Sequence, residues 1–335
     1  MIILIAESNY SPEAVKVYKT LGEVYFWFPG SRSSDGDKVA KSVSELSQPD
    51  RDRFLSKIDI IVIRLMLNVR KDLIDRMSNL KIIATSTTGL NHIDVDYAEK
   101  RGVKVISLRG ETLFLRNIPS TAEETWGLLL ALVRNLPWAF DDVKNGNWTP
   151  NKWVGHQLMG KTIGLLGLGR LGKIVAEYAV AFKMNVISYD PAVSQKEMKK
   201  YGAKKVAMDY LFKNSDIVSL HVLLNDETYG LVKDDHLKMM KPTAYLINTA
   251  RGELIEKGGL ESALEKKWIA GAAIDVMWDE KDDSGHLKDN KLMEYAKKNT
   301  NLIIVPHIGG TTYDATRITQ DFIAELVRKN CKKSG

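Results

Sequence analysis

The chain has 335 residues, of which 44% are hydrophobic and 27% are charged. These proportions are those of an ordinary globular protein, and they exclude a disordered chain and a disulfide-rich miniprotein. Lysine and arginine total 48 against 42 for aspartate and glutamate, a net charge of +6. Because the basic residues are spread along the chain, the charge favours a small anionic ligand over a nucleic acid.

The sequence also bears on location. The single cysteine, Cys331, cannot form an intrachain disulfide, which fits a reducing compartment. The apolar start Met1–Ala6 is too short for a signal peptide, and no uncharged stretch reaches the length of a membrane span. We therefore expect a cytoplasmic protein without membrane contact.

Short runs rich in Ile and Val alternate with amphipathic segments in the first third of the chain. Strands are expected at Ile2–Ala6, Val24–Trp27, Ile58–Ile63, Lys81–Ser86 and Val103–Ile106, and helices at Pro12–Thr20, Lys71–Met77 and Ile93–Arg101. Such alternation predicts βαβ units, that is, a parallel sheet covered by helices.

A long helix is expected next, from Ser120 to Leu136. Ser120 and Glu123 have the spacing of a capping box, and Pro137 would end the helix. The aromatic and polar stretch Trp138–His156 is predicted to be irregular.

A second alternating series follows. Its strands are expected at Thr162–Leu166, Asn185–Tyr189, Ile217–His221, Ala244–Asn248, Ala272–Val276 and Leu302–Val305, before a last helix at Thr311–Asn330. Two series joined by a long helix predict two doubly wound α/β domains with a cleft between them. The last helix has no strand after it and could pack back on the first domain.

A glycine-rich turn opens the second series. The strand Ile163–Leu166 leads into Gly167, Gly169 and Gly172, spaced Gly-x-Gly-x-x-Gly, and a helical pattern follows. The first glycine permits a tight turn, the second lets the backbone approach a pyrophosphate, and the third lets the helix pack on the strand. This context predicts a dinucleotide site at the helix N-terminus.

An acidic residue, Asp190, ends the next strand, 18 residues after Gly172. A carboxylate there accepts hydrogen bonds from ribose hydroxyls and repels a 2′-phosphate, so NAD is favoured over NADP. A turn or capping role before Pro191 is the alternative.

Three polar side chains stand just beyond other strands: Arg251, Glu280 and His307. An arginine can bind the carboxylate or carbonyl of a 2-oxo acid, a histidine can exchange the hydroxyl proton, and a carboxylate can orient the imidazole. Taken singly, they fit equally well a surface ion pair, a solvated acidic loop and a structural histidine.

Together these segments resemble the D-isomer-specific 2-hydroxyacid dehydrogenases. The resemblance covers nearly the whole chain and rests on the glycine turn and on Thr87–Asp94, Asn248–Leu254, Ala273–Glu280 and Pro306–Thr312. It implies an α/β protein in which a Rossmann NAD-binding domain, residues 111–307, is inserted in a flavodoxin-like substrate domain formed by residues 1–110 and 308–335.

The resemblance also implies site residues. His307 would be the proton donor or acceptor, Glu280 its partner, and Arg251 the ligand of the substrate carboxylate and carbonyl. Substrate contacts would come from Arg64 and from the backbone of Thr88 and Gly89. The NAD contacts would be Gly167, Gly169, Arg170, Leu171, Gly172, Asp190, His221, Thr249, Asp275, Gly309 and Gly310. A homodimer is implied as well, and no metal motif is present.

The chain departs from the family pattern at several positions. Leu65-Met66 follow Arg64 where small polar residues are expected, which weakens the case for a phosphorylated substrate. Glu124 stands where many members have a histidine, and the usual proline two residues after His221 is missing. Only 28 residues follow His307, so we expect no appended regulatory domain.

The sequence thus predicts an NAD-dependent oxidoreductase that transfers a hydride between the nicotinamide and a small D-2-hydroxy or 2-oxo acid. The alternative is a non-catalytic NAD(H)-sensing scaffold that binds a protein partner, because a fold alone does not fix a function. A nucleic-acid binder ranks last, since no motif accompanies the basic charge.

Overall fold

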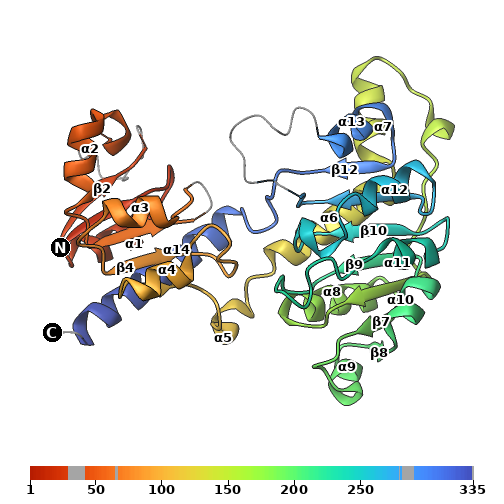
Figure 1. Cartoon of the computed structure of the whole chain (residues 1–335). Coiled ribbons are helices and arrows are strands. Elements are labelled where there is room, and N and C mark those ends of the chain that lie inside the picture. The colour runs from red at the N-terminus through yellow and green to blue at the C-terminus, as the bar shows by residue number, and fades with distance from the viewer. Residues whose placement is uncertain (29–41, 65–66, 279, 281–289, 334–335) are drawn as a thin grey trace. The chain divides into compact units, whose positions relative to one another are not determined.

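The computed structural model describes residues 1–28, 42–64, 67–278, 280 and 290–333. The chain divides into two compact units, Met1–Ile118 with Thr312–Gly335, and Pro119–Thr311 (Figure 1). The sequence interpretation placed the two borders at residues 110/111 and 307/308. In both descriptions the second unit is an insertion in the first.

In the described part of the first unit, five parallel strands form one sheet. They are β1 (Ile2–Ile5), β2 (Glu23–Phe26), β3 (Ile60–Ile63), β4 (Ile82–Thr85) and β5 (Lys104–Ile106), in the order β2-β1-β3-β4-β5. This is the flavodoxin-like order. All residues of β3 and β4 are buried, which explains why β3 is wholly apolar and why three apolar residues begin β4.

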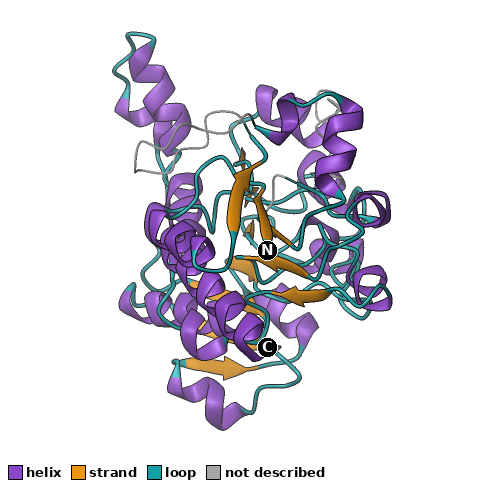
Figure 2. Ribbon diagram, turned by 90° about the vertical axis from the view of Figure 1, so that its left-hand side faces the viewer, coloured by secondary structure: helices purple, strands orange, loops and turns teal. Residues whose placement is uncertain are grey.

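Helices cover both faces of this sheet (Figure 2). They are α1 (Pro12–Lys19), α2 (Gln48–Leu55), α3 (Lys71–Arg76), α4 (Val95–Lys100), α5 (Thr112–Leu115) and α14 (Tyr313–Lys333). The C-terminal helix α14 packs on this unit, where Ile323 and Val327 share a core with Ile3 and Tyr18. Ser11 ties α1 to α14, because its backbone N–H donates to Gln320 Oε1 at 2.7 Å.

In the described part of the second unit, seven parallel strands form the other sheet. They are β6 (Thr162–Leu166), β7 (Asn185–Tyr189), β8 (Ala203–Lys205), β9 (Ile217–Leu220), β10 (Tyr245–Asn248), β11 (Gly271–Ile274) and β12 (Leu302–Ile304). Their order, β8-β7-β6-β9-β10-β11-β12, is the doubly wound Rossmann order with one strand added. The predicted α/β class with two parallel sheets is confirmed.

The helices of the second unit are α6 (Ser120–Val133), α7 (Leu136–Lys144), α8 (Arg170–Ala181), α9 (Gln195–Lys200), α10 (Met208–Asn214), α11 (Asp234–Met239), α12 (Gly259–Glu265) and α13 (Lys291–Lys298). The strand order reverses between β6 and β9, so the carboxyl ends of these strands form the point where ligands bind in open α/β sheets. No described helix of the chain is long and apolar enough to cross a membrane.

Two local predictions were wrong. Ser120 is the first helical residue of α6 and not its N-cap, because Pro119 occupies the N-cap position. Pro137 does not begin an irregular stretch. It lies in the first turn of α7, where backbone N–H groups have no acceptor within the helix, so a proline is tolerated.

Candidate active site

The glycine turn joins β6 to α8 and has the geometry that a dinucleotide requires. Gly167 has φ +93°, and a Cβ there would lie 2.8 Å from the carbonyl oxygen of His221. A Cβ on Gly172 would lie 2.4 Å from the carbonyl oxygen of Gly167, so only glycine allows this approach of helix to turn. A Cβ on Gly169 would meet nothing within 4 Å, which leaves open space over the backbone at the N-terminus of α8.

Asp190 lies at the carboxyl end of β7, beside this turn. Its Oδ2 accepts a hydrogen bond from the Leu168 N–H at 2.8 Å, and its Oδ1 accepts one from the Ala192 N–H at 2.9 Å. The turn role that the sequence left open is therefore present. A carboxylate oxygen has more than one lone pair, so these bonds do not prevent ribose hydroxyls from binding.

His221 follows β9 on the other side of the turn. Its N–H donates to the Leu166 carbonyl at 2.8 Å, and its Nε2 lies 2.9 Å from Ser219 Oγ. Burial lowers the pKa of His221 to about 4, so the imidazole is neutral at neutral pH. Ser219, a site residue that sequence reasoning missed, supplies the polar partner of this neutral ring.

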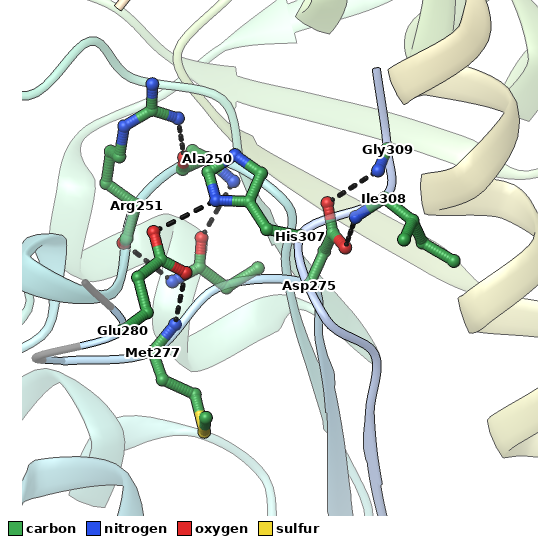
Figure 3. A network of polar contacts seen from close by, with 9 residues as sticks. Ala250, Arg251, Asp275, Met277, Glu280, His307, Ile308 and Gly309 are labelled. Carbon is green, nitrogen blue, oxygen red and sulfur yellow. Dashed lines mark hydrogen bonds and ion pairs between the residues drawn. The ribbon is translucent and has the colours of Figure 1, made fainter. Parts of the chain in front are cut away.

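The structure brings Arg251, Glu280 and His307 together at the carboxyl ends of β10, β11 and β12 (Figure 3). His307 Nδ1 lies 2.9 Å from Glu280 Oε1, and Glu280 Oε2 accepts a bond from the Met277 N–H at 3.4 Å. The two side chains are 30% and 21% exposed, so the pair is sheltered yet open to a ligand. With Nδ1 on the carboxylate, Nε2 is the nitrogen left to face a substrate.

Arg251 is held by the backbone around it. Its Nη1 donates to the Ala250 carbonyl at 2.6 Å, while the Asn248 side chain binds both the Ala250 N–H and the Arg251 carbonyl, at 3.0 and 2.9 Å. The next residue, Gly252, lies against another loop, because a Cβ there would be 2.2 Å from the carbonyl carbon of Met277. This close crossing sets the distance between the arginine segment and the loop that carries Glu280.

The backbone of His307 is unusual, with φ +53°, a left-handed conformation that few residues other than glycine adopt. The N–H of His307 donates to the Asp275 carbonyl at 3.0 Å. The next two N–H groups, of Ile308 and Gly309, donate to Asp275 Oδ1 and Oδ2 at 2.6 and 2.9 Å. Asp275 is 2% exposed, and burial raises the pKa of its carboxyl despite these bonds.

Helix α6 packs on the same strand ends through its first turns. Thr125 Oγ1 lies 2.8 Å from Thr249 Oγ1, and both residues are buried. Thr249, predicted as a cofactor contact, is therefore bonded to α6. A Cβ on Gly309 would lie 3.1 Å from Thr121 Cγ2 and 2.8 Å from Asp275 Oδ2, so Gly309 fits between helix and carboxylate.

Glu124 lies on the same helical face, three residues after Thr121. Burial raises the pKa of Glu124, and the negative charge of Asp275 raises it further. The sequence marked Glu124 only as a departure from the family pattern. Its position beside Asp275 follows from the packing of α6 on β11 and could not be read from spacing.

The predicted substrate residues lie in the other compact unit, at the carboxyl ends of its strands. The Arg64 N–H donates to Glu7 Oε1 at 2.7 Å, and burial lowers the pKa of the Arg64 guanidinium while the Glu7 charge opposes this. Leu65 and Met66, the departure noted in the sequence, lie outside the described residues.

The loop of Thr88 and Gly89 follows β4, and the Thr87 hydroxyl donates to the Gly89 carbonyl at 2.8 Å. In the second unit, Arg170 begins α8, where burial lowers the pKa of its guanidinium, and Leu171 follows it. Gly310 comes directly after the loop that Asp275 binds.

Comparisons with known proteins identify the family to which the chain belongs. Residues 126–309 match the family model described as D-isomer specific 2-hydroxyacid dehydrogenase, NAD binding domain. The chain is 36% identical over 292 residues to the glyoxylate reductase of Thermococcus litoralis, covering 84% of this chain and 83% of the relative. It is 34% identical over 299 residues to the hydroxypyruvate reductase of Thermotoga maritima, covering 89% and 92%.

Another relative is longer than this chain. The D-3-phosphoglycerate dehydrogenase of Methanocaldococcus jannaschii is 32% identical over 333 residues, which are 98% of this chain and 57% of the relative. Among solved structures, D-lactate dehydrogenase from Aquifex aeolicus complexed with NAD and lactic acid matches with a TM-score of 0.79 at 28% identity, covering 99% of this chain and 96% of that one. The chain belongs to the D-isomer-specific 2-hydroxyacid dehydrogenase family.

Proposed function

We propose that the chain is an NAD-dependent dehydrogenase that interconverts a small 2-oxo acid and its D-2-hydroxy acid. The observation that carries the proposal is the His307–Glu280 pair at 2.9 Å, with Arg251 beside it (Figure 3). An imidazole oriented by a carboxylate, next to a guanidinium, can exchange a proton with an oxygen whose neighbouring carboxylate is bound. The names of the glyoxylate and hydroxypyruvate reductases point to the same substrate class.

The residues around the glycine turn fit a dinucleotide. The open space over Gly169 and the N-terminus of α8 suit a pyrophosphate, and Asp190 suits the ribose hydroxyls. Arg170, Leu171, His221 and the backbone near Gly310 are proposed as further contacts. When bound, the nicotinamide supplies or accepts the hydride.

Side chains and backbone groups of the chain would bind the substrate carboxylate and transfer the proton. Arg251 would bind the substrate carboxylate and polarise its carbonyl. In the first unit, Arg64 and the backbone of Thr88-Gly89 are proposed as substrate contacts. In the reducing direction, His307 Nε2 would donate its proton to the carbonyl oxygen as the oxygen gains negative charge. Glu280 would keep accepting the Nδ1 hydrogen bond and would stabilise the imidazolium, which forms again in the reverse direction.

A homodimer in the cytoplasm is part of the proposal. Helix α7 exposes Leu136, Phe140 and Val143, which are 52%, 63% and 51% exposed, and Trp148 beyond it is 82% exposed. Clustered apolar side chains of this kind are typical of a surface that another chain covers. The molar mass in solution, measured by light scattering, tests the dimer.

The test of the activity is NADH oxidation by the purified protein across a panel of 2-oxo acids, repeated with NADPH. We expect turnover with at least one acid, and a loss of about a hundredfold or more in His307→Ala, with NADH affinity retained. Near-normal turnover in His307→Ala would refute the assignment. NADH binding without turnover on any acid would favour the non-catalytic scaffold.

A further inference from the structure

The proposed proton donor, His307, depends on a backbone conformation that its own side chain does not favour. A non-glycine residue at φ +53° is strained and persists only where the surroundings hold it. The residue before it is Pro306, and residues 308–310 are a loop with no helix or strand of their own. The position of the imidazole therefore depends on what binds this loop.

Asp275 binds the loop at three successive N–H groups. Its carbonyl accepts from His307, and its two carboxylate oxygens accept from Ile308 and Gly309, at 3.0, 2.6 and 2.9 Å. A carboxylate that receives two backbone N–H groups makes charge-assisted bonds, which are stronger than neutral ones. Asp275 is itself fixed, because it is 2% exposed and its N–H donates to the Asn248 carbonyl at 2.9 Å.

We propose that Asp275 is a positioning residue that holds His307 in its left-handed backbone and so aims the imidazole at the substrate. The role rests on the proposed function and differs from the cofactor contact expected of this residue. The bonds of Asp275 connect the segments that follow two neighbouring strands, because Asp275 follows β11 while His307 follows β12. The charged groups that face Asp275 are His307, Glu280 and Glu124, the last from α6.

The first test is Asp275→Asn, which keeps the shape of the side chain and loses its charge and one acceptor. Backbone hydrogen exchange, followed residue by residue by NMR, reads the bonds directly. We expect exchange at Ile308 and Gly309 to become about tenfold faster or more. We also expect kcat per NADH-binding site to fall about tenfold or more, with the dissociation constant of NADH changed less than about threefold.

Gly309→Ala perturbs the same contact from the other side and leaves Asp275 intact. Its Cβ would lie 2.8 Å from Asp275 Oδ2 and 3.1 Å from Thr121 Cγ2, so the carboxylate must move. We expect faster exchange at Ile308 and a lower kcat here too. This variant keeps the proposal testable if Asp275→Asn fails to fold.

The matched control is Asp216→Asn. Asp216 also accepts a backbone hydrogen bond, from the Thr162 N–H at 2.8 Å, and forms an ion pair with Lys241 at 2.9 Å. It lies at the amino ends of the strands, whereas Asp275 lies at their carboxyl ends. We expect exchange at Ile308 and Gly309, and kcat, to match the unmodified chain.

The outcomes separate the two proposals. Unchanged exchange at Ile308 and Gly309 in Asp275→Asn, or unchanged kcat, would overturn the positioning role. Weaker NADH binding with unchanged exchange would overturn it too and would restore the cofactor contact. Exchange can be measured in the absence of turnover, so an inactive protein refutes the proposed function alone.

Discussion

The half-buried imidazole of His221 makes the stability of the second unit depend on pH, and one substitution isolates this dependence. Burial lowers the pKa of His221 from 6.5 to about 4. Below pH 6.5 the unfolded chain takes up a proton at this residue and the folded chain does not, down to about pH 4. Stability contributed by His221 is therefore fully present above pH 6.5 and is lost as the pH falls toward 4.

The size of the effect follows from the shift. A change of 2.5 units between 6.5 and about 4 corresponds to about 3 kcal/mol, at 1.36 kcal/mol for each unit. The His221→Gln variant has no group at this position that titrates between pH 4 and pH 6.5, and the glutamine amide can still reach the Ser219 hydroxyl. As the pH falls from 7 to 4.5, the unmodified chain should therefore lose free energy of unfolding relative to the His221→Gln variant. The loss should be most of the about 3 kcal/mol.

Urea unfolding at a series of pH values, followed by tryptophan fluorescence, measures this difference. Six of the seven tryptophans lie between residues 119 and 311, so the signal reports the unit that contains His221. His156→Gln, which replaces an exposed histidine of the same unit, is the matched control substitution. A difference for His221→Gln that stays constant within about 0.5 kcal/mol would refute the reasoning.

Three further predictions concern the site and its supports. Glu280→Gln should lower kcat about a hundredfold to ten-thousandfold, because the imidazolium of His307 loses its carboxylate partner. Isothermal titration should show unchanged NADH binding. Retained kcat would contradict the role of the pair. Gly252→Ala should lower the free energy of unfolding, measured with urea, by about 1–3 kcal/mol, because the added Cβ would collide with the backbone of Met277. Gly127→Ala, whose Cβ would lie in open space on α6, should be neutral or stabilising. Equal effects of the two substitutions would contradict the collision. Burial and the charge of Asp275 raise the pKa of Glu124, so its ionisation opposes folding as the pH rises. Glu124→Gln should therefore raise the Tm at pH 8 more than at pH 4, and Glu123→Gln, which removes an exposed carboxyl from the neighbouring position, is the matched control.

The positions of most strands could be predicted from the sequence, because a strand buried on both faces needs an unbroken apolar run. The predicted Thr162–Leu166 and Asn185–Tyr189 agree with β6 and β7 residue for residue. Strand β8 was not predicted, because Ala203–Lys205 is a short polar edge strand without such a run. Helix α7 was missed because Pro137, which would break a helix interior, lies in a first turn.

The chemistry of the site was partly visible in the sequence. In a parallel sheet, polar residues that follow buried strands meet at one edge, so Arg251, Glu280 and His307 could be expected to lie together before any coordinates were known. Their number and order do not reveal which carboxylate binds which group. Glu280 and Asp275 both follow β11. The family resemblance implied Glu280 as the partner of His307, and the structure has this pair, but only the structure places Asp275 on the backbone N–H groups of the next loop.

The sequence by itself therefore determined the two parallel sheets, the glycine turn and the residue types of the site, since each of these depends on local pattern and strand spacing. Tertiary structure alone decided the left-handed backbone of His307, the bonds that Asp275 makes to it, and the pairing of Thr125 with Thr249, 124 residues later. The physical reason is that a buried hydrogen bond is chosen by the packing that brings donor and acceptor together. Residues far apart in the chain carry no periodic signal of that packing.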